Sequence, residues 1–199
     1  AKPIFQQALT LYESIDRTTI QYTNCLANLA DTMSALGENE RAEPLFNEAI
    51  TRAITAENSN NILGPILYNF ARNLEALKRP SEAAAVYYHA YAAYSTLTES
   101  DTHQADCLHN LAEILLKQGK SGEAEICYLQ ALEKYEKNNR RTNKRYSECK
   151  LSLSKLMSKR TRAKIVNLDD PEDLGALWHQ EFQEGNTEQS IYILRRMLY

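Results

Sequence analysis

Three asparagines stand 41 residues apart in this sequence: Asn28, Asn69 and Asn110. A carboxamide donates and accepts hydrogen bonds together, so it can pair with the main chain of an extended peptide whatever the sequence of that peptide. The alternative is that each asparagine bonds within its own protein and keeps neighbouring segments in register. The regular spacing makes this set the first candidate for a binding function.

Candidate residues for metal binding or catalysis are sparse by comparison. His103 and Cys107 are spaced i,i+4, and Cys127 is a conceivable third ligand, but a zinc site needs four grouped ligands, or three with an open position. A core cysteine beside a surface histidine is the simpler interpretation. His89 and His179 have no nucleophile at a suggestive spacing, and no phosphate-binding loop, GxSxG or HExxH motif is present. We therefore expect no enzymatic activity, no cofactor and no metal.

The four cysteines, Cys25, Cys107, Cys127 and Cys149, form no CxxC pair and no evenly paired framework. Such a pattern fits small buried apolar residues in a reducing compartment better than disulfides. No apolar run approaches the ~20 residues that cross a bilayer. With 43% hydrophobic and 25% charged residues, the sequence is typical of a globular protein, and we expect an intracellular, cytoplasmic location.

The elements that must carry the asparagines repeat with the same period. NLADTMSALGENERAEPLF, from residue 28, is echoed by NFARNLEALKRPSEAAAVYY from residue 69 and by NLAEILLKQGKSGEAEICYL from residue 110. A fixed period of 20–50 residues indicates a solenoid. No segment alternates with a period of two, so the fold class is all-α.

Each unit contains two helical patterns. In the first full unit, an apolar stripe at helical spacing comprises Leu26, Leu29, Ala30, Met33 and Leu36. Gly37 suits the end of that helix because it adopts positive φ freely. A polar link over residues 38–41 leads into a second stripe that begins at Ala42, and Pro44 is expected in the first turn of the second helix.

Small and bulky residues recur at fixed positions in these stripes. One small column is Ala30, Ala71 and Ala112, and another is Ala49, Ala90 and Ala131; the bulky column is Phe5, Phe46, Tyr87 and Tyr128. Small side chains let helix axes approach closely, and bulky ones fill the remaining gaps. A lone helix pair cannot bury its apolar face, so the units must stack on one another.

This order of small, bulky and small residues, after a Leu-x-x-Leu-Ala pattern and a glycine, resembles the tetratricopeptide repeat (TPR). The AEPLF run, the Asn-Leu-Ala start and a period above the usual 34 residues resemble especially the longer repeats of kinesin light chains. The resemblance covers residues 1 to about 137. It implies a right-handed superhelical solenoid of antiparallel helix pairs, with about ten helices.

The period divides the chain into an array over residues 1–160 and a C-terminal part. The array comprises a half repeat (1–18), full repeats at about 19–59, 60–100 and 101–141, and a degenerate first helix (142–160). Residues 161–199 are expected to form a linker and a degenerate helix pair that acts as a cap, with Trp178 buried in it. Because Ala1 falls inside a repeat, we expect this chain to be a piece of a longer protein.

The resemblance implies that the first helices line a concave groove and that asparagines hold the main chain of a bound peptide there. The candidate partner-binding residues are Asn28, Asp31, Tyr68, Asn69, Arg72, His109, Asn110, Glu113 and Lys117. Related repeats that bind chaperone tails use Lys and Arg to clamp a C-terminal carboxylate. Here such a carboxylate would meet Asp31 and Glu113, so a chaperone tail is not expected.

Positive charge is concentrated in residues 137–164, which hold 11 basic side chains and one acidic side chain. The candidate basic patch comprises Arg140, Arg141, Lys144, Arg145, Lys159 and Arg160. It could meet the phosphates of nucleic acid or of a membrane with anionic lipid. The alternative is a solvated helix face that pairs with an acidic partner or with the acidic repeats beside it.

The sequence thus predicts a non-catalytic protein–protein interaction module, an adaptor or scaffold that binds a partner peptide or helix in the groove. Two alternatives remain. The chain is a structural segment of a large assembly whose groove is filled by its own residues 171–199, or it attaches to nucleic acid or anionic lipid through residues 137–164.

Overall fold

The computed structural model describes residues 2–15, 19–56, 60–97, 101–138 and 144–156, together with residue 183. These ranges form eight α-helices and contain no strand: α1 (Lys2–Ile15), α2 (Ile20–Ala35), α3 (Asn39–Thr55), α4 (Asn60–Ala76), α5 (Pro80–Ser95), α6 (Asp101–Lys117), α7 (Ser121–Lys137) and α8 (Lys144–Leu156). The prediction of an all-α chain is confirmed. The other two of the ten expected helices, and Trp178, fall in residues 161–199, where only residue 183 is described.

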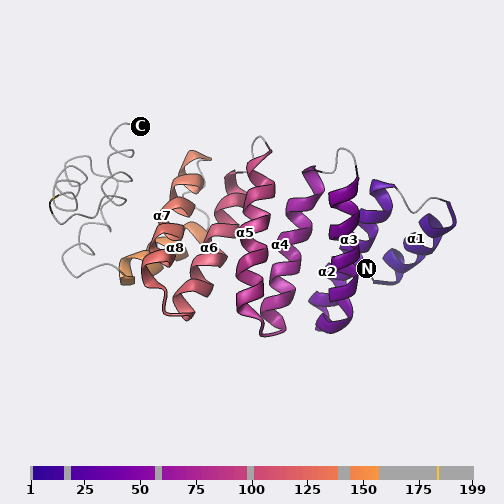
Figure 1. The fold of residues 1–199 in the computed structure, drawn as a ribbon, viewed down its shortest axis with the longest axis horizontal. Helices are drawn as coiled ribbons and strands as arrows, with labels where there is room; N and C mark the ends of the chain where they lie inside the picture. Colours follow the sequence, from indigo (N-terminus) through magenta and orange to yellow (C-terminus); the bar gives the residue numbers. More distant parts are fainter. Residues whose placement is uncertain are drawn as a thin grey trace.

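The helix pairs α2–α3, α4–α5 and α6–α7 follow one another in chain order along the long axis of the molecule (Figure 1). Pairs α2–α3, α4–α5 and α6–α7 are each joined by a three-residue turn. We call α2, α4, α6 and α8 the A helices and α1, α3, α5 and α7 the B helices. This architecture is a solenoid of stacked helix pairs, as the repeat predicted.

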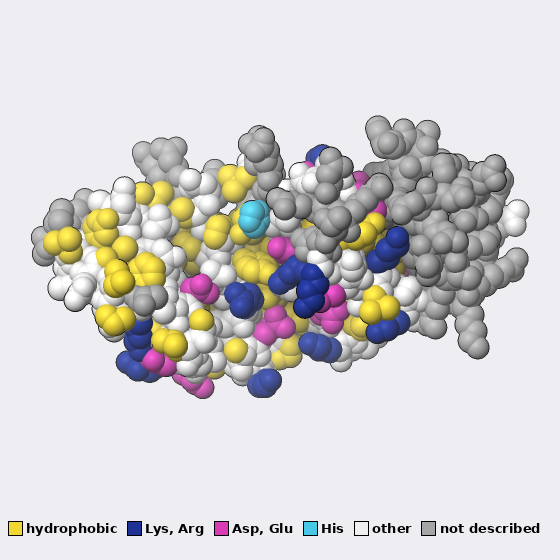
Figure 2. All heavy atoms as spheres, turned by 180° about the vertical axis from the view of Figure 1, so that it is seen from behind, with side chains coloured by type: hydrophobic (Ala, Val, Ile, Leu, Met, Phe, Trp, Pro, Cys, Tyr) yellow, Lys and Arg dark blue, Asp and Glu magenta, His cyan; other side chains and the backbone are white. Residues whose placement is uncertain are grey.

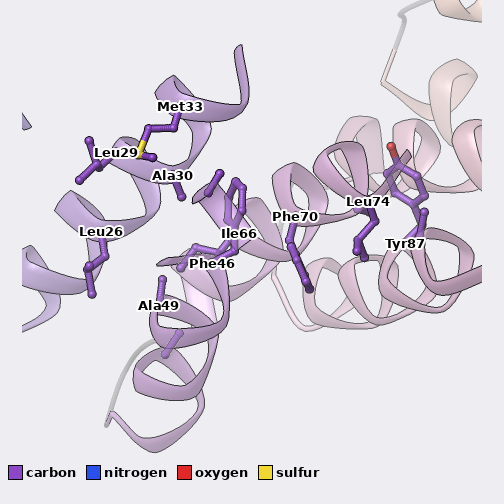
Figure 3. Packing of buried hydrophobic residues seen from close by; sticks show 14 of the residues in the cluster. Leu26, Leu29, Ala30, Met33, Phe46, Ala49, Ile66, Phe70, Leu74 and Tyr87 are labelled. Carbon is purple, nitrogen blue, oxygen red and sulfur yellow. The ribbon is translucent and has the colours of Figure 1, made fainter. Parts of the chain in front are cut away.

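The core lies where the small and bulky columns meet. All six alanines of the two small columns are 0% exposed, and so are the bulky residues Phe46, Tyr87 and Tyr128. Phe46 of α3 reaches the next unit, where its ring lies 5.6 Å from that of Phe70 in α4 (Figure 3). Burial of one large ring between units stabilises the stack by several kcal/mol, since deletion of such a ring costs roughly 3–5 kcal/mol.

The second helix of the first full unit begins earlier than the sequence predicted. The polar residues 38–41 were expected to link the two helices, yet α3 begins at Asn39, so Pro44 lies inside the helix rather than in its first turn. Glu40 and Arg41 are good helix formers, and the acidic Glu40 is favourable beside the positive end of the helix dipole. Polarity alone therefore did not mark a loop.

The turn between paired helices has the same geometry in all three full units. Gly37 and Gly119 have φ of 82° and 78°, and Lys78, at the equivalent position, has φ of 60°. The following amide closes the helix end in each unit, as in the bond of 2.9 Å from Arg79 N to the carbonyl of Leu74. The left-handed conformation costs a residue with a Cβ roughly 1–2 kcal/mol, so Lys78 is strained where the other units have glycine.

Substitution of Lys78 by glycine should stabilise the protein. Glycine relieves the left-handed strain but loses more chain entropy on folding, so the net gain in the free energy of unfolding is about 0.5–1 kcal/mol. Urea denaturation of Lys78→Gly checks this value. The matched variant Gly37→Ala should lose about 1 kcal/mol, because it places a Cβ on the same backbone conformation. Equal stability of all three proteins would contradict this interpretation of the turn.

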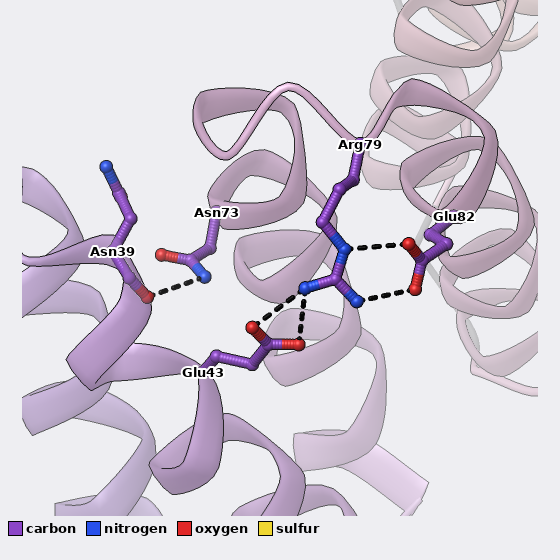
Figure 4. Close-up of polar contacts among 5 residues, drawn as sticks. All are labelled: Asn39, Glu43, Asn73, Arg79 and Glu82. Atoms are coloured by element: carbon purple, nitrogen blue, oxygen red, sulfur yellow. Dashed lines mark hydrogen bonds and ion pairs between the residues drawn. The ribbon is translucent and has the colours of Figure 1, made fainter.

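An arginine ties neighbouring units together at the turn of the second full unit. Arg79 Nη1 lies 2.7 Å from Glu43 Oε1 on α3, and its Nη2 lies 2.6 Å from Glu82 Oε2 on α5 (Figure 4). We call Glu43, Arg79 and Glu82 the second clamp. Beside it, Asn73 of α4 is fully buried and donates from Nδ2 to the carbonyl of Asn39, at 3.2 Å. Both contacts join α3 to the unit that follows it.

One period earlier, the equivalent positions carry the opposite charges. Glu38 Oε1 lies 2.5 Å from Lys2 Nζ on α1, and Glu38 Oε2 lies 2.8 Å from Arg41 Nη1. This first clamp lowers the pKa of Glu38, chiefly through the hydrogen bond from Lys2. Because the two clamps have reversed signs, unit two stacked on α1 would place Arg79 beside Lys2, and unit one stacked on α3 would place Glu38 beside Glu43. The reversed signs therefore disfavour an exchange of these two units.

Charge reversal tests the second clamp. Arg79→Glu should lower the midpoint of thermal unfolding because three carboxylates then meet at one turn. The triple variant Glu43→Lys, Arg79→Glu, Glu82→Arg gives the second clamp the charges of the first and should recover most of that loss. Circular dichroism melts at low and high salt make the comparison, since salt screens exposed ion pairs. If the triple variant is no more stable than Arg79→Glu, the clamp does not act as a unit.

Candidate functional site: the face of the A helices

The predicted partner-binding residues lie on the A helices and differ widely in accessibility. Asn28, Arg72 and Lys117 are exposed; Asp31, Tyr68, Asn69, Asn110 and Glu113 are half-buried; and His109 is only 7% exposed. Figure 2 shows one face of the molecule, on which basic and acidic side chains lie beside each other among hydrophobic ones. Among the described residues of that face, neither sign of charge dominates.

The third asparagine of the column is held by its own protein. Asn110 Nδ2 donates to the hydroxyl of Tyr68 on α4, at 3.1 Å. Its Oδ1 accepts a hydrogen bond from Arg145 Nη1 on α8, at 3.2 Å. Both polar ends of this carboxamide are therefore engaged, and the side chain links three successive A helices.

The same two partners are missing one unit earlier. Tyr68 and Arg145 are the two partners of Asn110. One period earlier, where the partners of Asn69 would stand, the chain has Ala27 and Gln104. Alanine has no hydroxyl, and the buried amide of Gln104 donates to the carbonyl of Tyr94, at 3.4 Å. Among the described residues, the Asn69 side chain has no hydrogen-bond partner.

Asn28 is also unengaged within the described ranges. Leu63 stands two periods before Arg145, at the position from which a partner would reach Asn28. Its side chain has no hydrogen-bond donor. The neighbouring charged residues Asp31 and Arg72 form no ion pair with any described residue. We call Asn28, Asp31, Asn69 and Arg72 the open face.

Arg145 is fixed by more than the asparagine. Its Nε lies 3.6 Å from Asp106 Oδ1, and that oxygen also accepts a hydrogen bond from the Tyr135 hydroxyl on α7, at 2.5 Å. Burial opposes the charge of Arg145, yet its pKa is raised because Tyr68 and Asp106 stabilise the guanidinium. The sequence had marked Arg145 only as part of a basic segment. The signal that it missed was the change from Gln104 to Arg145 at one position of the repeat.

Glu113 and His109 of the third unit also contact other parts of the protein. The Glu113 carboxylate accepts hydrogen bonds from the hydroxyls of Tyr128 and, at 3.2 Å, Ser152. His109 Nδ1 lies 2.9 Å from Cys149 Sγ of α8. Burial is the main cause that lowers the pKa of His109, so the imidazole is neutral at physiological pH. Unit three thus uses its polar A-helix side chains to hold α7 and α8.

Unit two has a related contact that involves Glu75. Tyr87 of the bulky column donates from its hydroxyl to Glu75, at 2.7 Å, and the Tyr68 ring meets the Tyr87 ring edge to face at 5.6 Å. Burial raises the pKa of Tyr87, so its hydroxyl remains a donor. A tyrosine in the bulky column needs such an acceptor, whereas Phe46 does not.

The cysteines and histidines do not form a reactive or metal-binding cluster in the described ranges. The four cysteines are free thiols, and burial raises the pKa of Cys127 to about 11 and of Cys107 to about 12, so both stay protonated at neutral pH. The His103 ring stacks on Tyr94 at 5.0 Å, while Cys107 is fully buried. No group of three or more His, Cys, Asp or Glu side chains in the described ranges could hold a metal ion.

The described part of the basic segment is partly paired with carboxylates. Lys144 Nζ lies 3.4 Å from Glu148 on the same helix, and Lys137 Nζ lies 3.0 Å from Asp101 Oδ2 on α6. Arg140, Arg141, Lys159 and Arg160 lie outside the described residues. Within the described ranges, no helix is both long enough and apolar enough to cross a membrane.

Comparison with known structures gives several solenoids of similar shape. BtubC (BKLC) from P. vanneervenii has a TM-score of 0.65 at 20% identity, covering 97% of this chain and 85% of that one. Nearly identical TPR-like repeats from Podosopora anserina, assigned to a kinesin light chain, have a TM-score of 0.65 at 16% identity, covering 93% and 87%. A Rap protein complexed with Competence and Sporulation Factor has a TM-score of 0.60 at 17% identity, covering 99% and 56%. At these identities the likeness concerns the fold.

Sequence comparison identifies the family. A search of curated protein sequences found no match. Two tetratricopeptide repeat family profiles match residues 23–61 and 63–137, together more than half of the chain. The stacked helix pairs and the buried small and bulky columns are the structural counterpart of these matches. The chain therefore belongs to the tetratricopeptide repeat family.

Proposed function

We propose that this chain is a non-catalytic interaction module, an adaptor or scaffold, that binds an extended peptide segment of a partner protein on the open face. Tetratricopeptide repeats generally form protein-interaction modules. The observation that carries the proposal is the difference within the asparagine column. The side chains of Asn28 and Asn69 have no hydrogen-bond partner among the described residues, whereas the scaffold engages Asn110 at both polar ends.

An extended peptide suits two free carboxamides one repeat apart. Its main chain offers a donor and an acceptor at each residue, and each asparagine can satisfy one of each. A net contribution of about 0.5–1.5 kcal/mol per hydrogen bond makes this contact useful but not sequence-selective. Selectivity would come from the flanking charges, because Asp31 and Arg72 present opposite signs to the partner.

Two further considerations support a protein partner over the alternatives. The Rap protein, whose fold is similar, was solved in complex with Competence and Sporulation Factor, so this architecture can bind another molecule. The described cations Lys137 and Arg145 lie beside carboxylates of α6, which reduces the charge that they offer to phosphates.

A chaperone tail fits the open face poorly, because Asp31 would repel its terminal carboxylate. The proposed occlusion by residues 171–199 concerns residues outside the described ranges, apart from residue 183.

The double variant Asn28→Ala, Asn69→Ala tests the proposal. A displayed library of random peptides is selected on the wild-type chain, and the tightest peptide is measured by calorimetry. Loss of two to four hydrogen bonds should weaken its affinity roughly 10- to 100-fold. The free energy of unfolding should change by no more than about 0.5 kcal/mol, because neither carboxamide holds a described part of the scaffold.

Asn47→Ala provides the matched control. Asn47 is an exposed asparagine on α3, a B helix, so the same atoms are removed from outside the open face. Its affinity for the selected peptide should equal that of the wild type. The proposal fails if no peptide is recovered that depends on Asn28 and Asn69, or if Asn47→Ala weakens binding as much as the double variant does.

A further inference from the structure

We propose that Arg145 of α8 is a built-in competitor for the third asparagine, so that the peptide site is two repeats long at rest and three repeats long when Arg145 is displaced. This inference rests on the proposed function, because it concerns the regulation of the same site. Arg145 Nη1 donates to Asn110 Oδ1 at 3.2 Å, which is the kind of hydrogen bond that a main-chain N–H of the partner would make.

The repeat makes this competition specific to one position. Asn28, Asn69 and Asn110 are equivalent in the sequence period, but only Asn110 has an arginine at the position that reaches it from the next A helix. The equivalent positions for the other two asparagines hold Leu63 and Gln104. Leucine cannot donate, and the Gln104 amide is already directed at the carbonyl of Tyr94. A charged donor is therefore present only where the site would extend into unit three.

Displacement of Arg145 requires no undocking of α8. The helix is anchored separately by Tyr146, Cys149 and Leu153, which are 6%, 0% and 0% exposed. The guanidinium also lies beside Asp106, so it can give up Asn110 and keep a carboxylate partner. Its side chain is 34% exposed, and solvent can therefore satisfy the freed N–H groups. The guanidinium also hydrogen-bonds to Tyr68, so the competition involves the hydrogen bonds of one side chain rather than a change of fold.

The Nδ2 group of Asn110 holds the side chain in place while Oδ1 changes its partner. This group is oriented by the Tyr68 hydroxyl, and Tyr68 precedes Asn69, the second asparagine of the column, in the sequence of α4. When Arg145 leaves, Oδ1 becomes an acceptor in a side chain whose orientation is already fixed. A peptide bound at Asn69 and continuing toward unit three would meet that oxygen next.

The experiment uses the peptide selected on the wild-type chain and two longer versions, each with about five alanines added at one end. Alanine extensions offer only main-chain groups, so any gain in affinity reports new main-chain contacts. On the wild-type chain, neither extension should improve binding. On Arg145→Met, one of the two extensions should improve affinity roughly 2- to 10-fold, the worth of one hydrogen bond. Adding Asn110→Ala to Arg145→Met should remove that gain.

Lys144→Met is the matched control, because it removes the same charge from the same helix, at a side chain that is 89% exposed and paired with Glu148. Lys144→Met should behave like the wild type toward all three peptides.

If Arg145→Met unfolds because Asp106 is left without its cation, the double variant Asp106→Asn, Arg145→Met removes the unpaired carboxylate charge and replaces Arg145→Met in the experiment.

The possible results separate the two proposals. The competitor role of Arg145 is overturned if the extensions act alike on wild type and Arg145→Met, or if the gain in affinity survives Asn110→Ala. The proposed function still stands in that case, provided that binding of the selected peptide depends on Asn28 and Asn69. If no peptide depends on Asn28 and Asn69, both proposals fall together.

Discussion

The structure depends on the burial of one aromatic ring from the B helix of each full unit. Phe46, Tyr87 and Tyr128 occupy this position and are completely buried, and alanines at the helix crossings let the backbones come close enough to enclose them. No unit can bury its ring alone, so the repeats are stable only as a stack. Each ring also dictates its surroundings. The two tyrosines require an acceptor for the hydroxyl, and this fixes Glu75 and Glu113 as structural carboxylates on helices that otherwise resemble binding elements.

The same constraint decides which part of the array is free to bind. Unit three holds its neighbours through polar side chains: Asn110 with Tyr68 and Arg145, Glu113 with Tyr128 and Ser152. Units one and two are joined by apolar contacts, by ion pairs at the turns and by the hydrogen bond from Asn73 to the Asn39 carbonyl. The carboxamides of Asn28 and Asn69 take no part in these contacts. Chemically equivalent residues in a repeat protein thus differ in role because their neighbours differ.

Much of the fold could be predicted from the sequence, because its signals are local or strictly periodic. The 41-residue spacing located the helix pairs, and the alanine columns located the core. The beginning of α3 at Asn39 could not be predicted from polarity, since Glu40 and Arg41 are as compatible with a helix as with a link. The strain at Lys78 has a signal in the period, which places it in one column with Gly37 and Gly119, but not in the residue itself.

The candidate site was harder to predict, because its contacts connect residues 35 to 42 positions apart. Asn110 was correctly placed on an A helix, but its bonds to Tyr68 and Arg145 depend on the offset between stacked units. No pattern within one unit carries that offset. Comparison of one unit with the next does carry it, since Ala27 and Gln104 stand where Tyr68 and Arg145 stand one period later.

The central claim is that two asparagine side chains of one column have no partner in the described part of the chain, while the third is held by Tyr68 and Arg145. The most direct measurement is the solvent exchange of their side-chain amide protons, by NMR on protein labelled with ¹⁵N at asparagine, with each signal assigned by Asn→Ala variants. Amide protons of Asn28 and Asn69 should exchange as fast as those of exposed Asn47, and those of Asn110 should be clearly protected. Equal protection of all three, or exchange of Asn110 as fast as Asn47, would contradict the account.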